Sequence, residues 1–329
     1  MNEPYQLKID AYSHIVPPEY GKALLKSAPA KLSQRANPIG PMWDLEERFR
    51  IMDHYGELVQ VLSLGWPPIA NMANPAKEVE LAKLANDTMM ELVHKYPHRF
   101  VAALAHLPAS NMDVALKELD RAIKDLGMRG VQVHTTENDR PLDSPEFMPL
   151  YEKMAEYDLP VFIHPITPKT APPTKYKIAG TFGWPYETTV AMTHLVFTGV
   201  MEKYPGLKVV THHCGGMVPF LAERIKEFYD LDEVLRSYKR TLKSAPIKYY
   251  QKFYADTAIY GNTPALMCGY SFFGVDHLLF GADMPLGDSQ RGYRNYRQTI
   301  NAIEQMAIGD EDKKKIYEEN ARNLMHLPI

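Results

Sequence analysis

The sequence is poor in the features that mark several classes of protein. Only two of its 329 residues are cysteine, so no disulfide framework is expected, and a reducing compartment such as the cytoplasm fits best. No apolar run approaches the roughly 18 residues that span a bilayer, and the first eight residues lack the apolar core of a signal peptide. Basic residues form no run and the formal net charge is -3, which argues against a nucleic-acid partner.

The chain does contain a regular alternation of short apolar runs and helical patterns. The runs have the composition of parallel strands buried on both faces. They cover residues 7–10, 58–63, 100–107, 130–135, 160–164, 207–213, 253–257 and 277–283. Helical patterns cover residues 45–55, 76–95, 112–126, 145–157, 187–204, 218–243, 263–273, 292–306 and 310–325, with Asp44 and Asn111 as N-caps of two of them.

This alternation predicts an α/β fold, a (β/α)8 TIM barrel formed by one domain over residues 1–329. An open doubly wound sheet is the alternative, but it usually carries a glycine-rich loop after the first strand, and none is present. Two strand-to-helix connections are long and rich in proline and polar residues, residues 15–43 after strand one and 165–186 after strand five. On a barrel both lie at the catalytic face, so both are expected to cover the active site.

Histidines gather at the expected carboxyl ends of the strands, where a barrel places its active site. Six of the 12 histidines lie at or just beyond such an end, and Asp283 ends the eighth strand. The six are His14, His106, His134, His164, His212 and His213. Imidazole and carboxylate together suit a divalent ion of borderline softness, although the same groups can perform acid–base chemistry without a metal.

Four short motifs in chain order carry a family resemblance. They are Asp-Ala-Tyr-Ser-His at 10–14, Phe-Ile-His-Pro at 162–165, His-Cys-Gly-Gly at 213–216 and Gly-Ala-Asp-Met-Pro at 281–285. Together they resemble the aminocarboxymuconate-semialdehyde decarboxylase group of the amidohydrolase superfamily. The resemblance spans nearly the whole chain, and each motif falls at a strand end.

This resemblance implies metal ligands at His14, His164 and Asp283, with zinc as the expected ion and manganese as the alternative. It also implies that His213 is the acid/base histidine and that Asp283 shares the proton transfer. His213 is chosen over His212 because neighbouring residues on a strand point to opposite faces.

Further residues are expected to contact the substrate. The resemblance implies that Arg48 holds a substrate carboxylate, with Arg50 as the alternative. Trp184, His106 and His134 are further expected contacts, and for the two histidines a purely structural role stays open.

Tyr12 departs from the family, which usually carries His-x-His on strand one. A phenol with a pKa of about 10 must lose its proton to bind a cation well. Weaker metal retention, a three-residue site, a tyrosinate ligand and a metal-free enzyme therefore all stay open, as does a contact between Tyr12 and the substrate.

The implied activity is the metal-dependent, non-oxidative decarboxylation of a small aromatic or enol-type carboxylic acid by a homodimer or larger homo-oligomer. A metal-dependent hydrolase or hydratase acting on a lactone, amide or unsaturated acid is the alternative, because the same residues can activate water. A barrel that binds a ligand without catalysis is the third reading.

Overall fold

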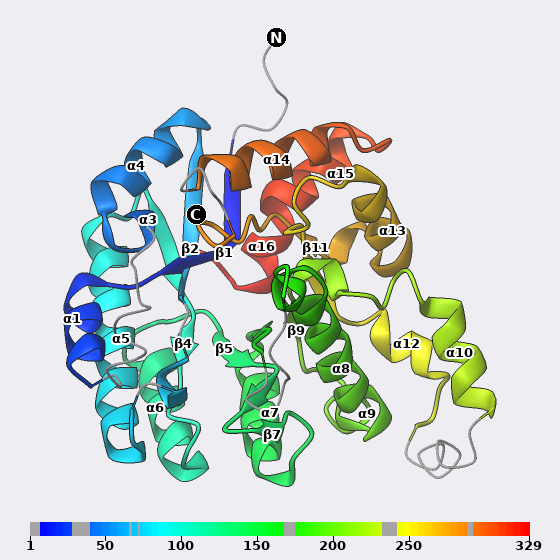
Figure 1. Cartoon of the computed structure of the whole chain (residues 1–329), viewed down its shortest axis with the longest axis horizontal. Coiled ribbons are helices and arrows are strands. Elements are labelled where there is room, and N and C mark those ends of the chain that lie inside the picture. The colour runs from blue at the N-terminus through cyan, green and yellow to red at the C-terminus, as the bar shows by residue number, and fades with distance from the viewer. Residues whose placement is uncertain are drawn as a thin grey trace.

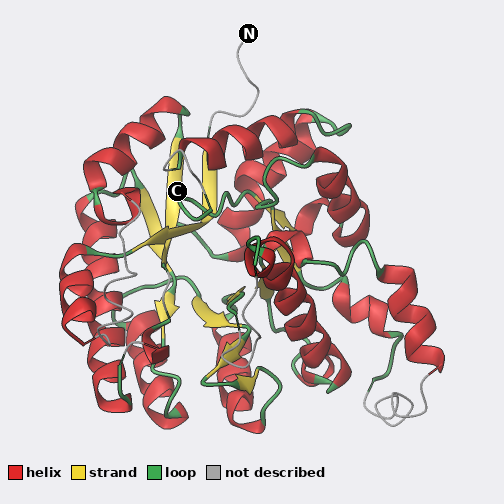
Figure 2. Cartoon of the chain, in the orientation of Figure 1, coloured by secondary structure: helices red, strands yellow, loops and turns green. Residues whose placement is uncertain are grey.

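The computed structural model describes residues 7–27, 40–65, 68–71, 73–167, 175–231, 242–287 and 292–329. Strands lie in the interior of the molecule and helices surround them (Figures 1 and 2). The strands of the barrel are β1 (Lys8–Ile15), β2 (Leu58–Leu64), β3 (Phe100–Ala103), β4 (Ala105–His106), β5 (Val131–His134), β8 (Val161–His164), β9 (Val209–Thr211), β10 (Tyr254–Asp256) and β11 (Leu278–Leu279), while β6 (Thr136–Glu137) and β7 (Arg140–Pro141) form a separate antiparallel pair. Each predicted strand run overlaps one of the barrel strands, and the run at 100–107 contains both β3 and β4.

The strands form a parallel barrel. One sheet has the order β1-β2-β3 and the other has the order β11-β10-β9-β8-β5-β4, and every pairing within them is parallel. β3 and β4 are successive parts of one strand. Backbone bonds from Ala11 N to Phe280 O and from His14 N to Met284 O, both 2.8 Å, join β1 to the chain around β11 and close the circle. The predicted TIM barrel is confirmed.

Helices fill the segments between the strands. They are α1 (Pro18–Ser27), α3 (Gly40–Trp43), α4 (Leu45–His54), α5 (Pro75–Lys95), α6 (Met112–Lys124), α7 (Met148–Tyr157), α8 (Trp184–Phe197), α9 (Val200–Lys203), α10 (Ala222–Leu231), α12 (Pro246–Tyr250), α13 (Thr263–Phe273), α14 (Tyr293–Glu304), α15 (Asp310–Lys314) and α16 (Asn320–Leu324). The predicted caps are confirmed, because Asp44 accepts from Glu47 N at 3.0 Å and Asn111 accepts from Val114 N at 3.2 Å. No helix among the described residues is long and apolar enough to cross a bilayer.

The two faces of the strands contact different cores. Apolar residues that point into the barrel pack together and against α16, and they include Ile9, Val61, Phe162, Val210 and Leu279. Alternate residues such as Val161, Ile163 and Val209 pack outward under the helices. Both faces are therefore apolar, as expected for a parallel barrel.

The two long connections differ in their described parts. In the first, α1 and α3 pack beside α5, where Tyr20 and Leu24 join a cluster with Leu81. Residues 28–39 of that predicted cover lie outside the described residues. In the second, residues 165–167 and 175–186 flank the strand ends, and residues 168–174 lie outside the described residues.

Candidate metal centre

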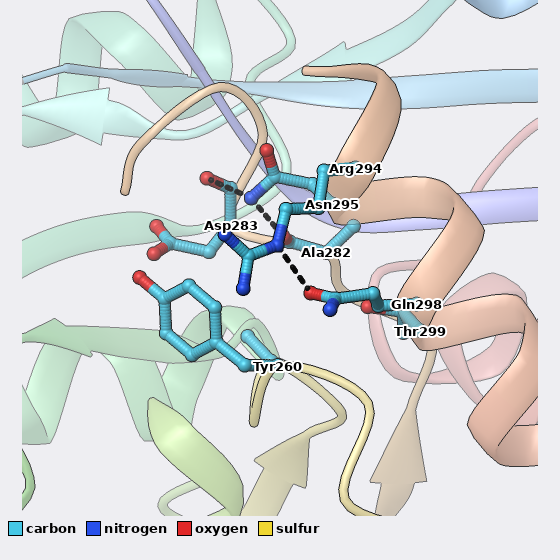
Figure 3. Close-up of a pocket in the computed structure, with 8 residues that line it drawn as sticks. Tyr260, Ala282, Asp283, Arg294, Asn295, Gln298 and Thr299 are labelled. Carbon is cyan, nitrogen blue, oxygen red and sulfur yellow. Dashed lines mark hydrogen bonds between the residues drawn. The ribbon is translucent and has the colours of Figure 1, made fainter. Parts of the chain in front are cut away.

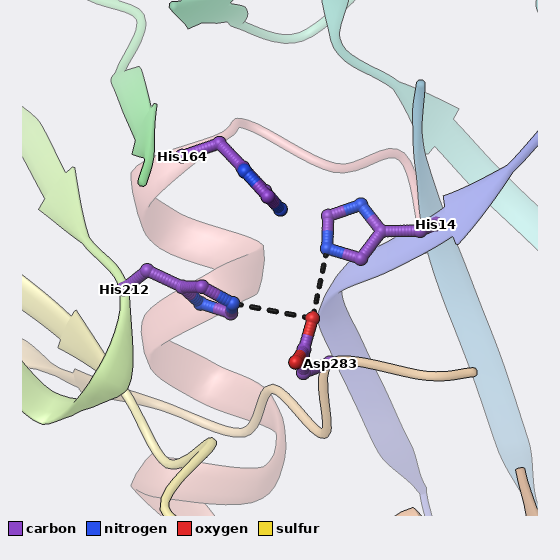
Figure 4. A group of neighbouring side chains, drawn as sticks. All are labelled: His14, His164, His212 and Asp283. Carbon is purple, nitrogen blue, oxygen red and sulfur yellow. Dashed lines mark ion pairs between the residues drawn. The ribbon is translucent and has the colours of Figure 1, made fainter. Parts of the chain in front are cut away.

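Four side chains from four different parts of the barrel meet at the carboxyl ends of the strands (Figure 4). His14 lies on β1, His164 ends β8, His212 follows β9 and Asp283 follows β11. The Oδ1 atom of Asp283 lies 3.1 Å from Nε2 of His14 and 3.2 Å from Nε2 of His212. One ligand atom from each of the four residues lies within 4.8 Å of all the others. We refer to these four residues as the strand-end cluster.

Among the described residues, the converging atoms of the strand-end cluster have no hydrogen-bond partner, and the two contacts of Asp283 with His14 and His212 are close ion pairs. Nε2 of His14, His164 and His212 and Oδ1 of Asp283 are all buried and make no bond of proper hydrogen-bond geometry. Leaving buried polar atoms unpaired is costly, so such a group calls for an explanation. Three imidazole nitrogens and one carboxylate oxygen are the ligand types of a zinc-like or manganese-like ion, so these residues fit a divalent metal.

Contacts behind the cluster fix the direction of each imidazole ring. Nδ1 of His14 lies 2.8 Å from Ser63 Oγ, and Nδ1 of His164 donates to Pro165 O at 2.9 Å. Nδ1 of His212 bonds to the Asp256 carboxylate. In each case the other ring nitrogen, Nε2, is turned toward the centre, which is how metal-binding histidines are usually held.

Burial and neighbouring charges shift the pKa values of all four cluster residues. Burial lowers the pKa of His14, and burial together with His14 lowers the pKa of His164 well below its ordinary value. Burial alone would raise the pKa of Asp283, but His212 and His14 hold it well below its ordinary range. Burial would lower the pKa of His212, but Asp256 and Asp283 raise it to about 10. His14, His164 and the Asp283 carboxylate are thus in their ligating forms near neutral pH, whereas His212 is protonated and would release its proton on binding a metal.

The backbone adopts left-handed φ angles in the segments that follow β9 and β11. Asp283 has a φ of 57°, and His213 and Cys214 have φ values of 55° and 52°. Non-glycine residues in this left-handed region carry a strain on the order of 1–3 kcal/mol each, and such strain concentrates at functional sites. The Asp283 turn is held from outside by Asn295, whose Nδ2 donates to Ala282 O at 3.0 Å and to Leu286 O at 3.0 Å.

The expected choice between the two adjacent histidines is wrong in its strand parity. Val210 points into the barrel and Val209 points outward, so the next inward position is His212. Shifting the parity by one residue moves every side chain to the opposite face. His213 lies beyond the strand end, and its left-handed turn brings it to the pocket as well, with its ring 4.2 Å from that of His212. Burial and the neighbouring His212 lower the pKa of His213 to about 4.

Arg48 is not among the residues that line the two cavities above the strand-end cluster, which are described below. Its side chain is 0% exposed. Its Nε donates to Pro41 O at 2.8 Å, and its Nη1 donates to Ser13 Oγ at 2.9 Å and Gln60 Oε1 at 2.7 Å. Its Nη2 donates to the backbone carbonyl of His14. These contacts make Arg48 a support for the end of β1 instead of a substrate contact.

The alternative arginine is also remote from the cluster, because Arg50 is exposed and lies 3.9 Å from Glu46 on the surface of α4. Trp184 is the expected substrate contact that does border the pocket. It lies at the start of α8, and its Nε1 donates to Thr167 Oγ1 at 3.1 Å.

Tyr12 lies beneath the cluster and is fully buried. Its ring centroid is 5.0 Å from that of His14 and 4.9 Å from that of His212. Its hydroxyl has no hydrogen-bond partner in the part of the chain that the structure describes. Burial, with the Asp256 and Asp283 charges, raises the pKa of Tyr12 well above its ordinary value, which favours the neutral phenol over a tyrosinate.

His106 and His134 extend the row of histidines away from the cluster. The rings of His134 and His164 are 6.1 Å apart, and those of His106 and His134 are 5.6 Å apart. Nδ1 of His134 lies 2.9 Å from Glu137 Oε1, and His106 N donates to Asn86 at 2.8 Å. Both are buried beside the cluster, and neither is among the residues that line the two cavities described next.

Two adjoining cavities open above the strand-end cluster. The cluster pocket has a volume of about 470 Å³ and is lined by His164, Pro165, Ile166, Thr167, Trp184, His212, His213, Asp283, Leu286 and Gly287. The outer pocket has a volume of about 560 Å³ and is lined by Lys177, Gly180, Thr181, Trp184, Pro185, His213, Gly216, Ala258, Ile259, Tyr260, Gly287 and Arg294. They share Trp184, His213 and Gly287, so a ligand can extend from one into the other.

Sequence reasoning missed His212, Asp256 and Arg294. The adjacent pair His212-His213 contained the signal for the first, but in a strand buried on both faces the pattern does not reveal which parity points inward. Asp256 lies one residue before the end of the predicted seventh strand, residues 253–257, and its position there was the available signal for a supporting carboxylate. No short motif marks Arg294, which lies on a helix after the last strand.

Comparisons with known proteins show which family the chain resembles. A family model described as amidohydrolase matches residues 9–327. A gamma-resorcylate decarboxylase of Polaromonas sp. (strain JS666 / ATCC BAA-500) is 30% identical over 294 residues, covering 86% of this chain and 87% of the relative. A 2-amino-3-carboxymuconate-6-semialdehyde decarboxylase of Dictyostelium discoideum is 28% identical over 322 residues, covering 92% of this chain and 87% of the relative.

A solved structure is similar over nearly the full length. It is a dihydroxybenzoic acid decarboxylase from Polaromonas sp. JS666 with bound manganese and the inhibitor 2-nitroresorcinol. Its TM-score is 0.80, its identity is 27%, and the match covers 98% of this chain and 97% of that one.

Proposed function

The chain belongs to the amidohydrolase family, and from that premise we propose that it is a carboxy-lyase that decarboxylates a small aromatic carboxylic acid at a divalent metal ion. The observation that carries the proposal is the convergence of four orphaned ligand atoms below a cavity of about 470 Å³. A cavity of this size accommodates a small-molecule ligand. The decarboxylase relatives favour this activity over the hydrolase, hydratase and non-catalytic alternatives.

His14, His164 and Asp283 would hold the metal, and His212 would complete the set. A bound divalent ion would polarise an oxygen of the substrate next to the carboxylate. The donor types suit zinc, which remains our expectation, while the similar structure with bound manganese makes that ion the first alternative.

Loss of CO2 breaks the bond between the ring carbon and the carboxylate carbon and leaves the electron pair on the ring carbon, which must then take up a proton. We assign this transfer to His213, because its imidazole borders both pockets. Since its pKa is about 4, His213 would first take a proton from the substrate hydroxyl or from water and then pass it to the ring carbon. Asp283 is the second candidate, since its carboxylate faces the cluster pocket. Positioned acid–base groups of this kind contribute about 10²- to 10⁴-fold to a rate.

The apolar walls of the cluster pocket would assist the reaction by excluding water from the bound substrate. Ile166, Leu286 and Trp184 present apolar surface above the cluster. Apolar walls of this kind keep water away from the end of the substrate that lies against the cluster.

A single assay in deuterated water tests the proposal. The manganese- or zinc-loaded protein is incubated with gamma-resorcylate, 6-methylsalicylate and muconate-type acids, and CO2 and product are analysed by mass spectrometry. The expected result is CO2 release with one deuteron on the carbon that lost it. In a parallel incubation in oxygen-labelled water, incorporation of the labelled oxygen into the organic product would reject the proposal. It would also be rejected if no acid released CO2 and His164→Ala behaved as the parent protein.

Two further expectations belong to this proposal. The protein is expected to form a homodimer or larger homo-oligomer, which light scattering after size exclusion measures directly. Cys214 and Cys268 are both free, so a reducing compartment, the cytoplasm, remains our expectation.

A further inference from the structure

An acid substrate needs a cationic partner, and Arg48 is committed elsewhere. Among the described residues that line the two pockets, the arginine and lysine side chains are Arg294 and Lys177. Lys177 is exposed on the segment before α8, whereas Arg294 is half-buried in the first turn of α14. The two cations therefore differ in how firmly the fold positions them.

Arg294 is held in place by its neighbours. The next residue, Asn295, ties the first turn of α14 to the Asp283 turn through the backbone carbonyls of Ala282 and Leu286. Nε of Arg294 donates to Gln298 Oε1 at 3.1 Å, one turn further along the helix. The guanidinium is thereby directed toward the space between Tyr260 and Asp283 (Figure 3).

Tyr260 completes this corner of the outer pocket. Arg294, Tyr260 and Asp283 also border one small cavity between the pocket and α14. A Cβ atom added at Gly287 would come 2.0 Å from the Tyr260 hydroxyl oxygen, so the phenol lies directly over the turn that follows Asp283. A guanidinium and a phenol at one place form a donor set for an anionic oxygen group.

We propose that Arg294, assisted by Tyr260, forms the subsite that binds the carboxylate of the substrate, an assignment that rests on the proposed function. A planar guanidinium can bind a carboxylate through two parallel hydrogen bonds, which a lysine cannot reproduce. The outer pocket that contains Arg294 meets the cluster pocket at His213. An acid held at Arg294 would therefore have its carboxyl end in the pocket that the proposed proton carrier His213 also borders, and its ring toward the strand-end cluster.

The test compares each acid with the phenol that remains after it has lost CO2. Binding of 2,6-dihydroxybenzoate and 1,3-dihydroxybenzene, and of 6-methylsalicylate and 3-methylphenol, is measured by calorimetry on the manganese-loaded protein. The variants are Arg294→Gln, Arg294→Lys and, as the matched control, Lys177→Gln. Metal content and thermal unfolding are recorded for all four proteins, so that a variant with a disturbed site is recognised.

The parent protein should bind at least one acid more tightly than its phenol. Arg294→Gln should weaken acid binding by about 10- to 100-fold, the size expected for a lost charge-assisted contact, and leave phenol binding and metal content unchanged. Arg294→Lys should recover part of the loss, and Lys177→Gln should bind the acid as the parent protein does.

Equal binding of acid and phenol by the parent protein, an unchanged acid affinity in Arg294→Gln, or an equal loss for acid and phenol would each overturn the assignment. Turnover measured in parallel separates the two proposals. An acid preference that depends on Arg294 without CO2 release would reject the decarboxylase function alone, and CO2 release with normal acid binding in Arg294→Gln would reject only the subsite.

Discussion

Two groups of buried polar side chains lie next to each other in this barrel, and they differ in how completely their hydrogen bonds are satisfied. The arginine network consists of Asp10, Ser13, Arg48, Gln60 and Tyr296. The strand-end cluster consists of His14, His164, His212 and Asp283. Both include residues of β1, and Arg48 donates to the backbone carbonyl of His14, so the two groups are in direct contact.

In the arginine network each donor faces an acceptor. Asp10 accepts from Tyr12 N, Ala282 N and the Tyr296 hydroxyl, at 3.2, 3.3 and 2.7 Å. In the strand-end cluster, the three Nε2 atoms and Oδ1 of Asp283 converge without a hydrogen-bond partner among the described residues. The difference teaches that buried charge alone does not mark a functional site. Saturated polar groups hold the fold, whereas unsaturated and convergent ones indicate a place for a ligand.

The largest expected effect is a loss of activity at the unsaturated group. Asp283→Asn keeps the size of the side chain, and asparagine tolerates the left-handed backbone there. It removes a metal ligand and a proton carrier, so kcat/KM should fall by about 10³-fold or more while metal content drops. The metal-free variant should unfold within about 1 kcal/mol of the metal-free parent protein. A variant that retains its metal and its rate would place the chemistry elsewhere.

Next in size is a loss of stability at the saturated group. Arg48→Met leaves Gln60 and the carbonyls of Pro41 and His14 without their donor. The free energy of unfolding in urea should fall by about 3–5 kcal/mol. Arg50→Met on the exposed face of α4 is the matched control and should change stability by less than about 0.5 kcal/mol. A stable Arg48→Met protein with a raised KM would restore the substrate-binding role that the sequence indicated.

The pH dependence of stability provides a smaller effect. Burial raises the pKa of Asp10 from 3.8 to about 6. Because the folded-state pKa is the higher one, ionisation opposes folding, and this part of the stability is lost as the pH rises from about 4 through 6. Asp10→Asn removes the titration. Its free energy of unfolding, relative to the parent protein, should therefore rise by roughly 2–3 kcal/mol between about pH 4 and pH 7. A difference that is constant with pH would contradict the raised pKa.

The smallest effect is expected at Tyr12, which lies between the two groups. Its hydroxyl is buried without a partner, so Tyr12→Phe removes an unsatisfied group and should change stability by less than about 1 kcal/mol. Metal content, measured by inductively coupled plasma mass spectrometry, should stay the same. A marked loss of metal in Tyr12→Phe would instead identify the phenol as a ligand.

The barrel was predictable because its signals are local. Strand runs such as 160–164 and caps such as Asp44 depend on neighbouring residues alone, and the structure reproduces them. The convergence of His14, His164 and Asp283 was also predictable, since the carboxyl ends of parallel strands must meet at one mouth.

The remaining features depend on information that the sequence pattern does not contain. His212 was excluded because strand parity cannot be read where Val209 and Val210 are both buried. Arg48 was misplaced because the direction of its helix face depends on the partners that it meets 35 residues away at Ser13. The helix α1 within the first long connection was missed because its packing against α5 is a tertiary effect.

The most direct measurement is anomalous diffraction from crystals grown with manganese or zinc. The account predicts one peak, within roughly 2.0–2.2 Å of Nε2 of His14, Nε2 of His164 and Oδ1 of Asp283, with Nε2 of His212 facing the same ion. A fully loaded crystal with no peak among these atoms, or with the ion bound elsewhere, would contradict it.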